Sequence, residues 1–84
     1  MEEPAYGLFN SEILRELVIM EMPYGKYRGR VLCDLPVSYV EWLYNQGLPG
    51  GKMGMLLGTL YEIKINGLDY LLKKIRQSDR SDYR

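Results

Sequence analysis

Apolar residues recur at helical spacing in four segments of the chain, and polar or glycine-rich breaks separate these segments. The pattern predicts helices from residue 10 or 11 to about 20, from 34 to 47, from 52 to 66, and from 66 to about 76. The third segment gives the strongest signal, with apolar residues at i, i+3, i+4, i+7 and i+8: Met53, Leu56, Leu57, Leu60 and Tyr61. We therefore expect this stripe to lie in the core.

Residues at the helix boundaries support this division. Asn10 or Ser11 can cap the first helix, and Asp34 is the predicted N-cap of the second helix, with Pro36 in its first turn. Gly47 suits the end of the second helix. The pair Asn66-Gly67 either ends or kinks the third helix, and Asn66 can cap the last one.

The segment between the first two helices has a different character. Pro23 stops any helix, and Gly25 and Gly29 permit the positive φ angles of a tight connection. Residues 20–22 and 30–33 suit short strands. We therefore predict an α+β fold, in which a short antiparallel β-hairpin with residues 24–29 at its tip packs against three or four helices.

Length and composition indicate one small domain over residues 1–84, with flexible ends at about 1–9 and 77–84. No apolar run approaches the length of a membrane span, and Glu2 and Glu3 stand where a secretory signal would carry Lys or Arg. Together with the single cysteine, Cys33, these features lead us to expect a cytoplasmic protein with no membrane contact. So small a chain has spare apolar surface, which a homodimer would cover.

The distribution of charge is more informative than its total. Eleven basic and eleven acidic residues cancel, yet residues 23–32 hold three cations and no acid, and residues 71–84 hold five cations and two acids. A neutral protein has no global attraction for nucleic acid, so any such role depends on these two basic islands.

Catalytic and metal chemistry find little support in the sequence. The chain has no histidine and one cysteine, so neither a zinc set of N and S ligands nor a Ser-His or Cys-His pair can form. Gly50-Gly51-Lys52 departs from a phosphate-binding loop, because Gln46 and Met53 replace the required Gly and Ser or Thr. We expect no metal, no cofactor and no enzyme activity, with carboxylate catalysis as the remaining enzymatic alternative.

The segment over residues 23–30 is the best candidate for a binding site. It combines cations with aromatic rings, and the candidate binding residues are Tyr24, Lys26, Tyr27, Arg28 and Arg30. Phosphates attract Lys and Arg, unstacked bases attract aromatic faces, and protein partners use Tyr and Arg as hot spots. The alternative to a binding role is a structural role, in which Tyr24 and Tyr27 pack on the core. The residues expected to support the loop are Gly25, Gly29, Asp34, Pro36, Tyr39 and Trp42, of which Tyr39 and Trp42 fit the core better than a ligand platform.

The same residues resemble a known family. Met22-Pro-Tyr-Gly-Lys-Tyr-Arg-Gly-Arg, followed by Asp34-Leu-Pro, Tyr39 and Trp42, is similar to the M-P-F-G-K-Y-K-G…D-L-P-x-x-Y-x-x-W pattern of short bacterial proteins catalogued as putative quorum-sensing-regulated virulence factors. Tyr24 replaces the usual Phe, and Arg28 the usual Lys. The resemblance covers residues 18–72 and implies no assigned enzyme activity.

These observations favour a small non-catalytic binding or adaptor module. In a second interpretation the basic loop binds nucleic acid, aided by Lys73, Lys74 and Arg76. In the third interpretation the protein is a small enzyme. The partner, a protein or a nucleic acid, is not identified by the sequence.

Overall fold

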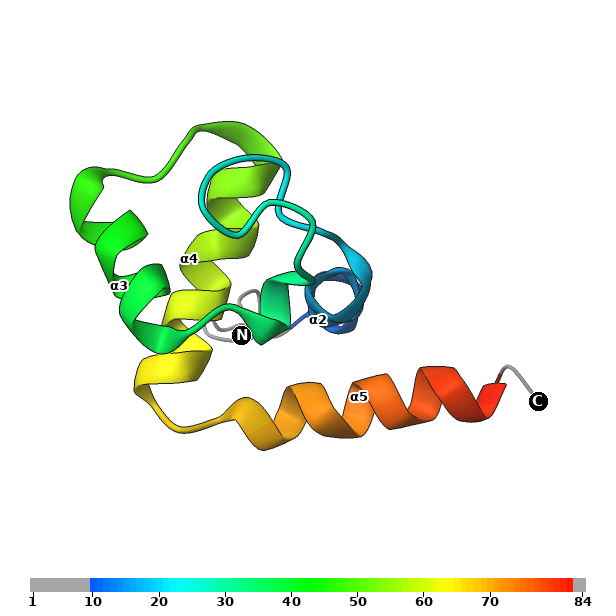
Figure 1. Cartoon of the computed structure of the whole chain (residues 1–84). Coiled ribbons are helices and arrows are strands. Elements are labelled where there is room, and N and C mark those ends of the chain that lie inside the picture. Colours follow the sequence, from blue (N-terminus) through cyan, green and yellow to red (C-terminus); the bar gives the residue numbers. More distant parts are fainter. Residues whose placement is uncertain (1–9, 83–84) are drawn as a thin grey trace.

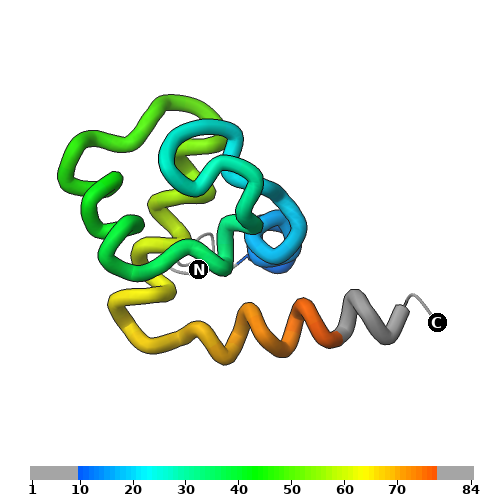
Figure 2. Tube along the Cα trace, in the orientation of Figure 1, coloured from blue at the N-terminus to red at the C-terminus, as the bar shows by residue number. Residues whose placement is uncertain are grey.

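The computed structural model describes residues 10–82, and the side chains of residues 10–77. These residues form four α-helices and one short 3₁₀ helix (Figure 1). In chain order they are α2 (Ser11–Ile19), η1 (Leu32–Asp34), α3 (Val37–Gln46), α4 (Gly51–Ile65) and α5 (Asp69–Asp82). Helix α4 packs against both α3 and α2, and α5 packs against α2. The chain trace shows α5 leaving the end of α4 and running along one side of the molecule (Figure 2).

Local capping explains where two of the helices begin or end. The Asn10 side-chain oxygen accepts hydrogen bonds from the backbone N–H groups of Glu12 (2.7 Å) and Ile13 (3.3 Å), which identifies Asn10 as the N-cap of α2. The Asn66 side-chain amide donates to the Glu62 carbonyl at 2.8 Å. Asn66 therefore closes α4, and the prediction that it caps α5 is wrong because α5 begins only at Asp69.

The core lies where α2, η1, α3 and α4 meet. The apolar stripe predicted for residues 53–61 lies here, with its leucines buried and Met53 and Tyr61 packed against them. The most deeply buried side chains are Leu17, Met22, Leu32, Leu35, Val40, Leu56, Leu57, Thr59, Leu60 and Ile63. Burial of this apolar stripe is the main force that holds the helices together.

The predicted α+β class is wrong, since the described residues are mostly helical and contain no β-strand. The two sides of the loop do approach each other, in one isolated antiparallel bridge between Glu21 and Val31. The Met22 N–H donates to the Arg30 carbonyl at 2.8 Å, and the Gly29 N–H donates to the Met22 carbonyl at 2.9 Å. Because α2 continues to Ile19 and η1 begins at Leu32, too few extended residues remain for a hairpin.

The predicted start of the second helix is also wrong in detail. Asp34 lies in η1, and α3 begins at Val37 with Pro36 in the N-cap position and no side-chain cap. The 3₁₀ turn moves the N-cap by two residues, from Asp34 to Pro36, and leaves the Asp34 carboxylate available for another partner.

Two further sequence predictions concern the ends of the chain and membranes. Residues 1–9, predicted to be flexible, lie outside the described residues, as do 83–84, and the backbone of residues 77–82 continues α5. Within the described part of the chain, every helix is too short or too polar to cross a membrane.

Candidate functional site

The segment over residues 23–30, which we call the basic loop, is a compact turn. Gly25 and Gly29 both have positive φ angles, +84° and +91°, as the sequence predicts for this connection. The Arg28 N–H donates to the Gly25 carbonyl at 3.1 Å. The side chains of Lys26, Arg28 and Arg30 are exposed, and none of the three forms an ion pair with another described residue.

Three rings, which we call the aromatic array, connect the basic loop to α3. Tyr27 meets Tyr39 edge-on, with the ring centroids 4.7 Å apart and the planes at 69°. Tyr39 in turn stacks on Trp42 at 5.9 Å and 21°. Both Lys26 Nζ and the Arg30 guanidinium carbon lie over the Tyr27 ring, at 5.5 and 5.2 Å from its centroid. The array therefore places two cations at one end and an indole at the other.

Gly25 is what allows the loop to approach α3 so closely. A Cβ atom at this position would lie 2.7 Å from the Tyr39 hydroxyl oxygen, and the φ of +84° also disfavours any side chain. The glycine predicted from the turn pattern thus has a second role, since it lets the loop backbone pack on the aromatic array.

The basic loop, α3 and the turn after α3 enclose an open groove of about 700 Å³. We call it the aromatic groove. Among the described residues its lining includes no Asp or Glu side chain, and its principal side chains are Tyr24, Lys26, Tyr27, Ser38, Tyr39, Trp42, Leu43, Gln46 and Pro49. The groove is therefore aromatic with a single cationic side chain in its wall.

Trp42 departs from its predicted position in the core, because 53% of its surface is exposed in this groove. At about 100° per residue, its side chain points about 100° away from Leu43 and 160° away from Val40, the two buried residues of α3. Helical geometry alone would have placed Trp42 off the core face. Tyr39, by contrast, is half-buried and packs against the core.

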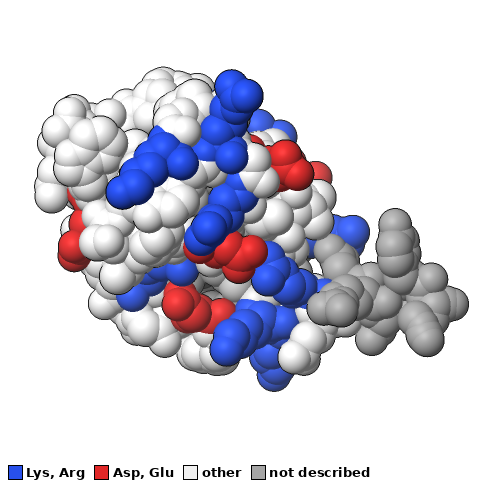
Figure 3. Space-filling view, viewed as in Figure 1, with Lys and Arg blue, Asp and Glu red and all other residues white. Residues whose placement is uncertain are grey.

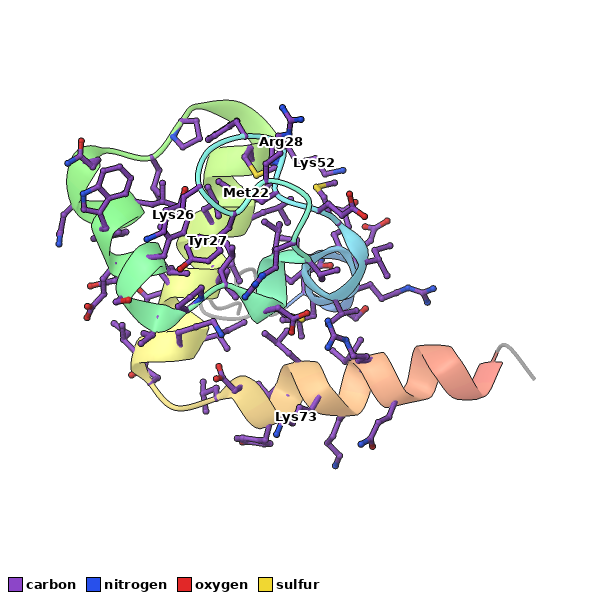
Figure 4. All side chains as sticks on the ribbon, in the orientation of Figure 1. Met22, Lys26, Tyr27, Arg28, Lys52 and Lys73 are labelled. Carbon is purple, nitrogen blue, oxygen red and sulfur yellow. The ribbon has the colours of Figure 1, made fainter. Side chains whose placement is uncertain are left out.

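The candidate binding residues do not all lie on one side of the loop. Figure 4 shows Lys26 and Tyr27 between the loop and α3, with Arg28 on the opposite side of the loop. Tyr24 lines the groove and is 44% exposed, whereas Tyr27 is half-buried. Sequence analysis did not include Ser38, Gln46 and Pro49 in the site, and no local pattern identifies them.

A second polar cluster joins η1 to α5. Arg76 donates to both Asp34 carboxylate oxygens (3.3 and 3.2 Å) and to Cys33 Sγ (2.9 Å), and Lys64 Nζ donates to the Cys33 carbonyl at 3.1 Å. Burial raises the pKa of the Cys33 thiol, and the Arg76 guanidinium offsets only part of this effect. Asp34 therefore secures α5 in place of capping α3, and Arg76 already has an anionic partner.

The remaining charges give no sign of a metal site. Among the described residues, no group of three or more His, Cys, Asp or Glu side chains is arranged to hold a metal ion. Lys52 pairs with Glu16 at 2.8 Å, and Lys64 pairs with Asp69 at 3.8 Å.

Comparison with known proteins gives a consistent but sparse result. A family model described as "Putative quorum-sensing-regulated virulence factor" matches residues 10–75. Two relatives, from Escherichia coli strain K12 and E. coli O157:H7, are both called "Uncharacterized protein YpeB". Each is 39% identical over 67 residues, which are 79% of this chain and 93% of the relative. No solved structure matches the chain.

Proposed function

This chain belongs to the family described as "Putative quorum-sensing-regulated virulence factor", whose E. coli members are uncharacterized, and from its own geometry we propose that it is a non-catalytic binding module. The aromatic groove and the basic loop form its contact surface. The family resemblance drawn from the sequence is confirmed, while the activity has to be argued from the site.

The observation that carries the proposal is the exposure of Trp42. The single tryptophan of the chain leaves half of its surface in solvent, and it lies in the groove, stacked on Tyr39. Trp and Tyr held rigidly in a groove are typical of residues that dominate binding energy. The neighbouring Lys26 adds a charge that can orient a ligand.

The chemistry of the groove supports binding rather than catalysis. Its hydroxyl groups come from Ser38 and tyrosines, and the chain has no histidine to activate them as nucleophiles. The described residues that line the groove also include no carboxylate pair for acid–base chemistry. What the groove does offer is ring faces, a cation and amide donors and acceptors, which are the elements of recognition.

A pull-down from E. coli lysate tests the proposal. Tagged wild-type protein is compared with Trp42→Ala, with the triple variant Lys26/Arg28/Arg30→Ala, and with Tyr70→Ala. Tyr70 is a matched control because it is 56% exposed on α5, away from the groove. We expect Tyr70→Ala to retain the wild-type partners and both groove variants to lose them, with circular dichroism showing that all fold. Identical partners for all four proteins would contradict the proposal.

A further inference from the structure

We propose that the ligand of the aromatic groove is a single-stranded nucleic acid, with one base stacked on Trp42 and adjacent phosphates bound by Lys26 and Arg30. This inference rests on the proposed function, since it names the class of ligand for the same surface.

The charge of the surface favours an anionic ligand. Lys26 lines the groove, Arg30 lies beside it over the Tyr27 ring, and both side chains are exposed. None of the described residues that line the groove is acidic, so none of them neutralises these two cations. Lys and Arg donors in this setting suit phosphate oxygens, which supply most of the contacts in protein–nucleic acid interfaces.

The rings favour a ligand with a flat face. Trp42 stacks on Tyr39 at 5.9 Å and still exposes 53% of its surface, so a further planar group can stack on the indole. Base stacking on aromatic side chains contributes substantially to the binding of single strands and tolerates any sequence. In a duplex both faces of each base are already covered by neighbouring bases, so the groove selects for unpaired strands.

Rings and cations also belong to one connected unit. Tyr27 carries both cations over its ring and contacts Tyr39, which contacts Trp42, so two ring contacts of 4.7 and 5.9 Å fix the cations relative to the indole. A nucleotide presents a planar base and an anionic phosphate together. A proline-rich peptide, the other common ligand of aromatic grooves, has no negative charge of its own to meet these cations.

The basic residues of α5 belong to a different patch. Figure 3 shows Lys and Arg side chains over the loop and over α5, with acidic side chains between the two groups. Arg76 and Lys64 are paired with Asp34 and Asp69. Lys73 and Lys74 are exposed on α5, and the site assigned here does not include them.

Fluorescence anisotropy with labelled oligonucleotides tests the assignment. The probes are a 12-nucleotide dT strand, a 12-base-pair duplex and a fluorescent proline-rich peptide, each titrated at 25 to 200 mM salt. We expect the strand to bind more tightly than the duplex or the peptide and to quench Trp42 fluorescence. With two phosphate contacts, log K should fall against log salt with a slope of about −1.4.

Variants locate the site. Trp42→Ala should weaken dT binding by about 5- to 150-fold, whereas Trp42→Phe, which keeps a ring face, should lose less. Lys26/Arg30→Gln should bring the salt slope close to zero. Lys73/Lys74→Gln removes two exposed cations from α5 and should leave the affinity and the slope close to those of the wild type.

Three results would overturn the inference: absence of dT binding at 25 mM salt and about 50 μM protein, tighter binding of the peptide, or an equal loss of affinity in the α5 variant. If Trp42→Ala fails to fold, the dT affinity of Trp42→Phe and the salt slope of Lys26/Arg30→Gln test the inference in its place. Loss of partners by the groove variants in the pull-down, combined with no dT binding, would uphold the binding module and reject its nucleic-acid ligand.

Discussion

At the scale of single residues, Gly54 has the closest approach to another backbone segment among the described glycines. A Cβ atom on Gly54 would lie 1.8 Å from the Pro49 carbonyl oxygen and 3.0 Å from the carbonyl carbon. Both are backbone atoms, so neither can move as a side chain would. We expect Gly54→Ala to lower the free energy of unfolding by about 3 kcal/mol or more, measured by urea denaturation.

Gly58, one turn further along α4, provides the matched control. A Cβ atom there would meet only the Leu48 Cδ1 methyl group, at an ordinary 3.4 Å. Because alanine favours a helix interior over glycine, Gly58→Ala should stabilise the protein by about 0.5–1 kcal/mol. If both substitutions had the same effect, the proposed contact between α4 and Pro49 would be wrong.

The second prediction at this scale concerns the reactivity of Cys33. Burial raises the pKa of the thiol above that of free cysteine, so less thiolate is present at pH 8 than in free cysteine. We expect the pH profile of iodoacetamide alkylation to have its midpoint above that of free cysteine. Because the Arg76 guanidinium lowers this pKa, Arg76→Gln should move the midpoint further up. A midpoint below that of free cysteine, or a downward shift in the variant, would contradict this account.

At the scale of elements, α2 has nine residues and is too short to be stable alone, so its cap matters. Asn10 satisfies two backbone N–H groups, whereas the Ser11 side chain makes no hydrogen bond with a described residue. Asn10→Ala should therefore lower the free energy of unfolding by about 1 kcal/mol. Ser11→Ala should change it by less than about 0.5 kcal/mol. The opposite order in thermal or urea denaturation would assign the cap to Ser11.

The helices were predictable because each carries its own signals. Asn10 begins α2, and Gly47 and the pair Asn66-Gly67 end α3 and α4, all through local backbone chemistry, while the apolar stripe of α4 has a clear period. The hairpin was a wrong prediction since the extended residues around the loop form only one bridge. Whether a short apolar run such as Val31-Leu32 continues a strand or turns into a 3₁₀ helix depends on packing, and Leu32 is fully buried in the core.

Contacts distant in sequence account for most of what was missed in the site. Asp34 looks like a cap beside Leu35 and Pro36, but its partner is Arg76, 42 residues away. Gln46 and Pro49 enter the groove only because the chain turns after α3 to begin α4. The loop residues themselves were predictable from their density of cations and rings, and the exposure of Trp42 could have been inferred from its angle around α3.

At the scale of the whole molecule, the described part of α5 buries fewer core residues than α4 does. Among the described side chains, Leu72 is the one core residue that α5 buries, while α4 buries five residues. The polar contacts of α5 through Arg76 are partly exposed, and exposed ion pairs contribute little to stability. We therefore expect α5 to open separately from the remaining helices, as locally less stable segments do.

A matched pair of Leu→Ala substitutions tests this expectation. Leu60→Ala, in the centre of α4, should lower the free energy of global unfolding by about 3–5 kcal/mol and reduce amide exchange protection throughout the chain. Leu72→Ala should mainly speed amide exchange in residues 69–77, leaving residues 56–63 protected, because α4 packs mainly against α2, η1 and α3. If Leu72→Ala reduced protection of α4 as much as that of α5, the five elements would unfold as one cooperative unit, and the groove between the loop and α3 would depend on α5 for its stability.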